Sequence, residues 1–161
     1  MGSTALIQHL DTLIKLHRSL LKLANQKTEA IKTNNIDVLE KLMNEEQKHI
    51  KAITQIENER LKEVALLMDH QDHTTPSLMD VIAQSEDGQS DLLKKQREQL
   101  LELTQQLKDA NHLNQQLIYS SLQYVNLTLD MLRPQEANYN YNKPANNGGQ
   151  HMKRSLFDSQ A

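Results

Sequence analysis

The sequence contains no cysteine and no tryptophan, and its 161 residues include one phenylalanine, four glycines and three prolines. Without cysteine the chain has no disulfide, no thiol nucleophile and no thiolate metal ligand, which is compatible with a reducing cytosol. Aromatic residues make up only 3% of the chain. Any core must therefore be aliphatic, as in helical bundles and coiled coils.

The chain also lacks an excess of charge of one sign. Its 18 basic and 21 acidic residues are interspersed and give a net charge of −3. Nucleic acids and anionic membranes attract basic surfaces, so neither is an expected partner. There is no apolar run of membrane-spanning length and no signal-peptide pattern at the start. We therefore expect no membrane insertion and a cytoplasmic location.

No known catalytic motif occurs: there is no phosphate loop, no G-x-G-x-x-G and no nucleophile elbow. We therefore expect no enzyme activity and no cofactor. His9 and His17 lie on similar faces of the first expected helix, and neither has a sequence neighbour that would make it a catalytic base.

Two short patterns could hold a metal ion. Glu46-x-x-His49 has the spacing used in di-iron bundles, but such sites need two of these pairs and two further glutamates. The polar stretch with Asp69, His70, Asp72 and His73 offers zinc ligands without a convergent third pair. We expect neither to be a metal site.

Apolar residues recur at intervals of three and four over most of the chain, as amphipathic helices require. The pattern predicts helices at about residues 4–33, 36–69, 76–84 and 90–133. The turn Thr33–Asn35 is short, with Asn35 as the cap of the second helix, so the first two helices should form an antiparallel hairpin.

The expected ends of the last two helices rest on cap and stop residues. Thr75 and Pro76 predict the start of the short helix, and residues 86–89 (E-D-G-Q) predict a turn. Ser90 is the expected N-cap of the last helix and Pro134 its stop. The predicted fold is all-α: an antiparallel bundle or coiled-coil hairpin of three long helices and one short helix.

The composition changes after Pro134, where a stretch rich in Asn, Tyr and Gly has no periodicity. We expect a bundle domain at residues 1–133 and a flexible tail at 134–161. Leu156 and Phe157 near its end are typical of a short docking segment, although a frayed terminus is the simpler interpretation.

The predicted helix 90–133 changes character midway. Up to Leu107 its polar positions are mainly charged, whereas from Asn111 onward they are almost entirely amides, hydroxyls and tyrosines. An uncharged polar face is typical of a surface that meets another protein. It is also compatible with a helix buried on several sides within its own bundle.

Several stretches, taken together in order and spacing, resemble the FlgN family of flagellar type III export chaperones. They are Ala30–Leu42, Glu45–Arg60, the T-P-S-L-M-D-V-I segment, and Asn111-x-x-Asn114-x-x-Leu117-Ile118 followed by Ser121-Leu122-x-Tyr124-Val125. The end of the chain, with Tyr139 or Tyr141, Gly148 and Gly149, is similar to the family's tail, although its glycines are displaced.

The resemblance implies a cytosolic chaperone that binds the C-terminal helical segments of flagellar hook–filament junction proteins. Such a chaperone would prevent premature assembly and deliver its clients to the flagellar export gate, with client contacts in the C-terminal half. Combining this with the uncharged face, we expect client contacts at Asn111, Asn114, Leu117, Ile118, Tyr119, Leu122, Tyr124, Val125 and Leu129. In the absence of a client, the tail could cover the same surface through Tyr139, Tyr141, Leu156 and Phe157.

Two other readings remain open. The chain could be a structural coiled-coil protein that self-associates through the last helix or the tail. It could also be an export chaperone for another flagellar client, such as the filament or cap protein.

Overall fold

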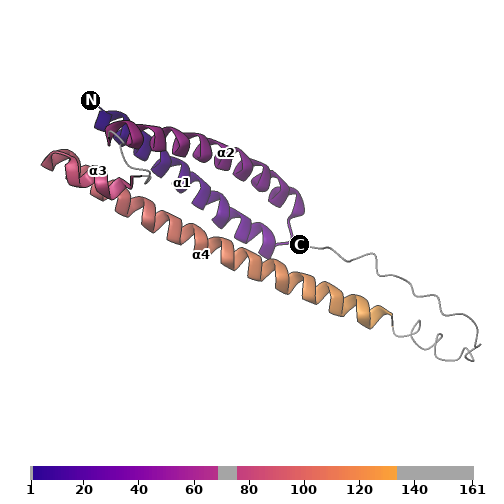
Figure 1. The fold of residues 1–161 in the computed structure, drawn as a ribbon. Helices are drawn as coiled ribbons and strands as arrows, with labels where there is room; N and C mark the ends of the chain where they lie inside the picture. The colour runs from indigo at the N-terminus through magenta and orange to yellow at the C-terminus, as the bar shows by residue number, and fades with distance from the viewer. Residues whose placement is uncertain (1, 69–75, 134–161) are drawn as a thin grey trace, which may run out of the picture. The chain divides into compact units, whose positions relative to one another are not determined.

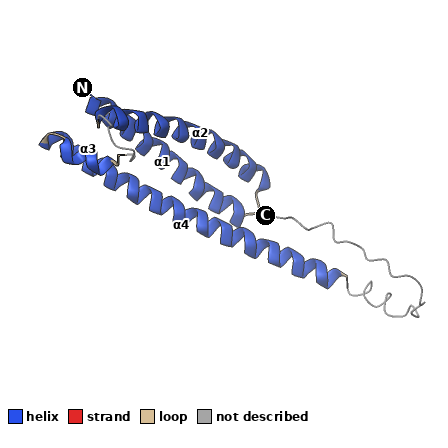
Figure 2. Cartoon of the chain, in the orientation of Figure 1, coloured by secondary structure: helices blue, strands red, loops and turns tan. Residues whose placement is uncertain are grey.

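A computed structural model describes residues 2–68 and 76–133 of the chain. These residues form four α-helices and no strand (Figures 1 and 2). The helices are α1 (Gly2–Lys32), α2 (Ile36–Leu67), α3 (Leu78–Gln84) and α4 (Asp87–Leu132). The predicted all-α fold of three long helices and one short helix is confirmed. The chain divides into two compact units, Met1–Leu122 and Gln123–Ala161.

In the first unit, α1 and α2 form a hairpin around a turn of three residues (Figure 1). Asn34 adopts a left-handed conformation with φ of 52°, which asparagine tolerates better than most residues. The side chain of Asn35 accepts a hydrogen bond from the Val38 backbone N–H at 3.3 Å. The predicted Asn35 cap of α2 is therefore confirmed.

The part of α4 that belongs to the first unit lies along α1 and runs parallel to it (Figure 1). Two side chains of α4 mark the register, because Gln96 donates to the carbonyl of Ile7 at 3.1 Å and Asn114 donates to the carbonyl of Ala24 at 3.0 Å. The two contacts are separated by a similar number of residues on each helix. Since α2 runs back along the hairpin, the three long helices have an up–down–up arrangement.

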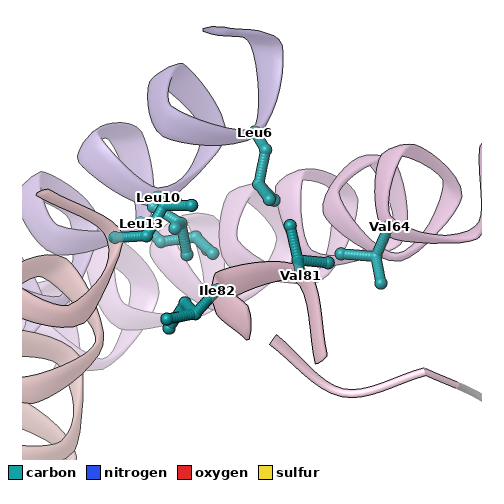
Figure 3. Close-up of a cluster of buried hydrophobic side chains, with 7 residues drawn as sticks. Leu6, Leu10, Leu13, Val64, Val81 and Ile82 are labelled. Carbon is teal, nitrogen blue, oxygen red and sulfur yellow. The ribbon is translucent and has the colours of Figure 1, made fainter. Parts of the chain in front are cut away.

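The core lies where α1 begins, α2 ends, α3 crosses and α4 begins (Figure 3). Its buried residues are all aliphatic: Leu6, Leu10, Leu13, Val64, Val81, Ile82 and Leu93. Val64 is the buried residue of α2, so the hairpin is packed most tightly at this end. Short α3 contributes Val81 and Ile82, which close the core between the ends of the long helices.

The start of α3 differs from the prediction. Ser77, not Thr75, is the N-cap, and it forms a capping box with Asp80, whose carboxylate accepts from the Ser77 backbone N–H at 2.8 Å. This bond, with a second from the Ser77 hydroxyl, holds the pKa of the Asp80 carboxyl below its ordinary value. Pro76 therefore precedes the helix.

The start of α4 also differs from the prediction, because the helix begins at Asp87 and includes Gly88. Ser90 is not its cap: Ser90 is buried inside the first turns and donates its backbone N–H to the carbonyl of Glu86 at 2.8 Å. Only Ser85 and Glu86 separate α3 from α4. The expected four-residue turn at 86–89 is thus absent.

The second unit is described for residues 123–133, which are the last turns of α4 and Arg133. Every one of these residues is exposed. The domain boundary that composition places after Arg133 coincides with the end of the described residues and stays a prediction.

Candidate functional site

The candidate site is the distal segment of α4, defined here as residues 111–132. Asp130 is the one Asp, Glu, Lys or Arg residue in this segment. Apart from half-buried Leu117, its large apolar side chains are 40–76% exposed: Leu113, Ile118, Tyr119, Leu122, Tyr124, Val125, Leu127, Leu129, Met131 and Leu132. A contiguous apolar surface of this kind is unusual on an isolated soluble protein and typically marks a binding surface.

Most of the residues expected to contact a client are exposed. Asn111, Ile118, Tyr119, Leu122, Tyr124, Val125 and Leu129 are exposed, and Leu117 is half-buried. The distal segment is therefore not enclosed by other helices among the described residues. Whether these side chains contact a client stays a prediction.

Asn114 is an exception and requires a correction. Its side chain is 3% exposed. The amide N–H donates to the carbonyl of Ala24, and the amide oxygen accepts from the Thr28 hydroxyl at 2.6 Å. Both ends of the amide are bonded to α1, so Asn114 fixes α4 against α1 and is not part of the exposed surface.

The distal segment is apolar over a wider arc than the rest of α4. At about 100° per residue, the buried and half-buried residues from Leu93 to Ala110 occupy an arc of about 160°, from Gln99 round to Arg97. From Leu113 to Leu132 the apolar residues other than Tyr119 occupy about 220°, measured from Leu127 round to Leu122 by the same rule. Both arcs are centred within about 50° of the same direction, so the apolar face widens where burial ends.

A family model described as FlgN protein matches residues 1–149 of the chain. The chain belongs to the FlgN family. It is also 35% identical over 162 residues to a Bacillus subtilis (strain 168) protein described as "Uncharacterized protein YvyG", with 100% of each chain covered. No solved structure matched the chain. FlgN proteins are a family of chaperones of flagellar assembly and not a family of enzymes. The resemblance to this family that was found from the sequence is therefore confirmed.

In this FlgN-family chain, the N-x-x-N motif of α4 has two different roles. Asn111 is exposed on the surface of the helix, whereas Asn114 is buried against α1. The two residues are three apart and so lie about 60° apart around the helix axis. Asn114 therefore takes part in packing the bundle, whereas Asn111 lies on the exposed surface of α4.

Sequence reasoning missed four apolar residues of the exposed arc: Leu113, Leu127, Met131 and Leu132. Their three- and four-residue spacing was visible in the sequence. Leu132 continues the stripe of Leu122, Val125 and Leu129, whereas Leu113, Leu127 and Met131 lie on a second stripe of the same helix, outside the predicted contacts.

The candidate metal ligands have other roles where the structure describes them. Glu46 pairs with Lys27 of α1 at 2.9 Å, and both side chains are largely buried (13% and 16% exposed). The ring of His49 lies 2.8 Å from the carbonyl of Glu45. Within residues 2–68 and 76–133 no group of three or more potential ligands could hold a metal ion.

The remaining candidates are structural or lie outside the described residues. His9 is 3.8 Å from Glu59 of α2, and the ring of His17 lies 2.7 Å from the carbonyl of Leu13. The loop with Asp69, His70, Asp72 and His73 is outside the described residues, as are the proposed tail contacts at Tyr139, Tyr141, Leu156 and Phe157. No described helix is long and apolar enough to cross a membrane.

Proposed function

We propose that this FlgN-family protein is a cytosolic export chaperone for the hook–filament junction proteins of the flagellum. It binds their C-terminal helical segments, prevents premature assembly, and delivers them to the flagellar type III export gate. The observation that carries the proposal is the exposed, nearly uncharged arc of the distal segment of α4. The junction proteins as clients come from the resemblance to the family.

The chemistry of the arc suits an amphipathic helix from a client. Ile118, Leu122, Val125, Leu129 and Leu132 follow a four–three spacing, which is the spacing that accepts a partner helix side by side. Amides and hydroxyls desolvate at lower cost than Lys or Glu, whose burial without a partner costs several kcal/mol. Asn111, Tyr119 and Tyr124 are exposed and can supply hydrogen bonds that set the client's register.

The test is a titration of the C-terminal region of a junction protein from the same bacterium against Leu122→Asp and Val125→Asp. Each change places an unpaired carboxylate in the proposed contact, so the affinity should fall about a hundredfold, a loss of about 3 kcal/mol. The matched control is Gln123→Asp, which adds the same charge on the polar side of α4. Equal affinities for wild type and both arc variants, with the fold intact, would refute the assignment of this surface.

The same titration with filament and cap proteins tests the identity of the client. We expect the junction proteins to bind more tightly than either. A tighter complex with filament or cap protein would keep the chaperone function and change the client.

A second candidate function is a self-associating coiled-coil protein, which the four–three spacing of the exposed residues also favours. Sedimentation of the purified chain separates the two. A stable oligomer that ignores junction proteins supports the structural role, whereas a one-to-one complex with a junction protein supports the chaperone.

The tail provides a further proposal about the same surface. We propose that residues 134–161 cover the distal segment when no client is bound, through Tyr139, Tyr141, Leu156 and Phe157. Removing residues 134–161 should then raise the affinity for a junction protein. An unchanged affinity would contradict covering by the tail and leave the client surface unaffected.

A further inference from the structure

The distal segment of α4 carries two apolar flanks. Flank A consists of Ile118, Leu122, Val125, Leu129 and Leu132, and flank B consists of Leu113, Tyr124, Leu127 and Met131. The centres of the two flanks are about 145° apart around the helix axis at 100° per residue. Flank A keeps the four–three spacing of a helix–helix seam over its whole length, and in flank B this spacing holds for Tyr124, Leu127 and Met131.

The strip between the flanks presents few polar groups that need a partner. It contains Leu117, Ser121 and Thr128. The Ser121 hydroxyl donates to the carbonyl of Leu117, and the Thr128 hydroxyl donates to the carbonyl of Tyr124, both at 2.9 Å. Because both hydroxyls are bonded within α4 itself, this strip can be covered by two neighbouring helices without leaving a donor unpaired.

The width of the arc exceeds what one helix covers. A helix packed against one neighbouring layer buries a stripe of at least about 100°, and α4 buries or half-buries about 160° between Leu93 and Ala110. The distal arc is wider, at about 220°, and overlaps the direction of that buried stripe. Two helical neighbours are therefore needed to cover it.

The buried area leads to the same result. Full burial of one aliphatic side chain removes about 60–120 Å² from water, and the flank residues are roughly half exposed. One flank of four or five residues then buries about 150–300 Å² of side chain on α4. A stable, specific complex buries about 800 Å² on each partner, so one flank supplies less than half of that area and both together supply much more of it.

We infer that one client chain binds α4 through two amphipathic helical segments, one on flank A and one on flank B, with the Ser121 and Thr128 strip between them. This inference rests on the proposed chaperone function and specifies the chemistry of its client. Each segment needs apolar residues at three- and four-residue spacing and few charges beside them, because the distal segment offers a single carboxylate, Asp130. A second copy of the chain is a less suitable occupant, because pairing through one flank leaves the other exposed for further copies.

Three consecutive residues of the second unit provide a matched test. Val125 lies on flank A, Asn126 on the polar side and Leu127 on flank B, and all three are exposed. The variants Val125→Asp, Asn126→Asp and Leu127→Asp introduce the same side chain in three directions around one helix. None of the three removes a buried contact, so all should keep the wild-type melting temperature.

The probe is the C-terminal region of a junction protein, used whole and divided into an N-terminal and a C-terminal half. With the whole region, Val125→Asp and Leu127→Asp should each weaken binding by about a hundredfold, while Asn126→Asp stays within about twofold. Each half of the region should be sensitive to one of the two flank variants only.

The other outcomes are distinguishable. A loss for Val125→Asp with wild-type affinity for Leu127→Asp would overturn the two-segment inference and leave the proposed function intact. No binding of the probe by the wild-type chain would overturn both. An oligomer of the chain alone that either flank variant dissociates would show that a second copy occupies the arc, and would overturn the inference.

Discussion

Replacing Asn114 with alanine should destabilise the bundle and leave client binding unchanged. The substitution removes the bond to the carbonyl of Ala24 and the bond from the Thr28 hydroxyl, each worth about 1 kcal/mol net. The void left by the amide adds to the cost. Part of the lost free energy is regained, because the Thr28 hydroxyl can donate instead to the carbonyl oxygen of Ala24, 3.2 Å from the Thr28 Oγ1. We expect a loss of about 2 kcal/mol, or a melting temperature lower by about 4–8 °C for a chain of this length.

Urea unfolding followed by far-ultraviolet circular dichroism measures this loss, and the matched control is Asn111→Ala in the same motif. Because Asn111 is exposed, its substitution should change stability by less than about 0.5 kcal/mol and should weaken client binding. A double-mutant cycle of Asn114→Ala with Thr28→Val should give a coupling energy of about 0.5–1.5 kcal/mol. Wild-type stability for Asn114→Ala together with weakened client binding would refute the placement of Asn114 inside the bundle.

Three further predictions concern the first unit. Lys27→Met leaves Glu46 without its partner in a largely buried position, so the free energy of unfolding should fall by about 2–3 kcal/mol, and adding Glu46→Leu should restore most of it; an unaltered unfolding curve for Lys27→Met would contradict a buried pair. Gly88→Ala should raise stability by about 0.5 kcal/mol, because Gly88 lies in the first turn of α4 and an added Cβ meets no atom within 4 Å; a lower melting temperature would show that α4 starts later. The pKa of Asp80 lies below its ordinary value of 3.8 through the Ser77 bonds, so its contribution to stability is complete above that value and is lost as the pH falls through the lower folded-state value. Wild type and Asp80→Ala should therefore differ in melting temperature at neutral pH and converge once the pH is below the folded-state pKa of Asp80, and a constant difference would exclude the capping role of the carboxylate.

The sequence predicted the helices well because their apolar periodicity is strong and their interiors contain little glycine or proline. It also predicted the α1–α2 turn, since Asn34 and Asn35 occupy positions where asparagine has a specific advantage. The predicted first residues of α3 and α4 were wrong. Ser90 has the character of a cap, but its backbone N–H donates to the carbonyl of Glu86, so α4 already begins at Asp87 and Ser90 is buried within its first turns.

The candidate site could be predicted in part. The loss of charge after Leu107 was visible in the sequence, and it identified a helix segment whose apolar residues are exposed in the structure. The role of Asn114 could not be predicted, because its partners Ala24 and Thr28 lie about ninety residues away in the sequence. The spacing of residues within one helix predicts which of them share a face. The hydrogen bonds that a side chain makes depend on the residues of the neighbouring helix, which the spacing does not identify.

The last turns of α4, from Leu122 to Leu132, bury none of their side chains among the described residues. Substitutions there cost the scaffold little free energy, because no core contact is lost. Selection can therefore change the residues of this stretch for their binding of a partner. Leu6 and Leu93 must instead be kept because they are buried in the core. A lineage could retarget such a protein to an altered cargo by a few changes at one helix end, while the rest of the molecule stays as it is.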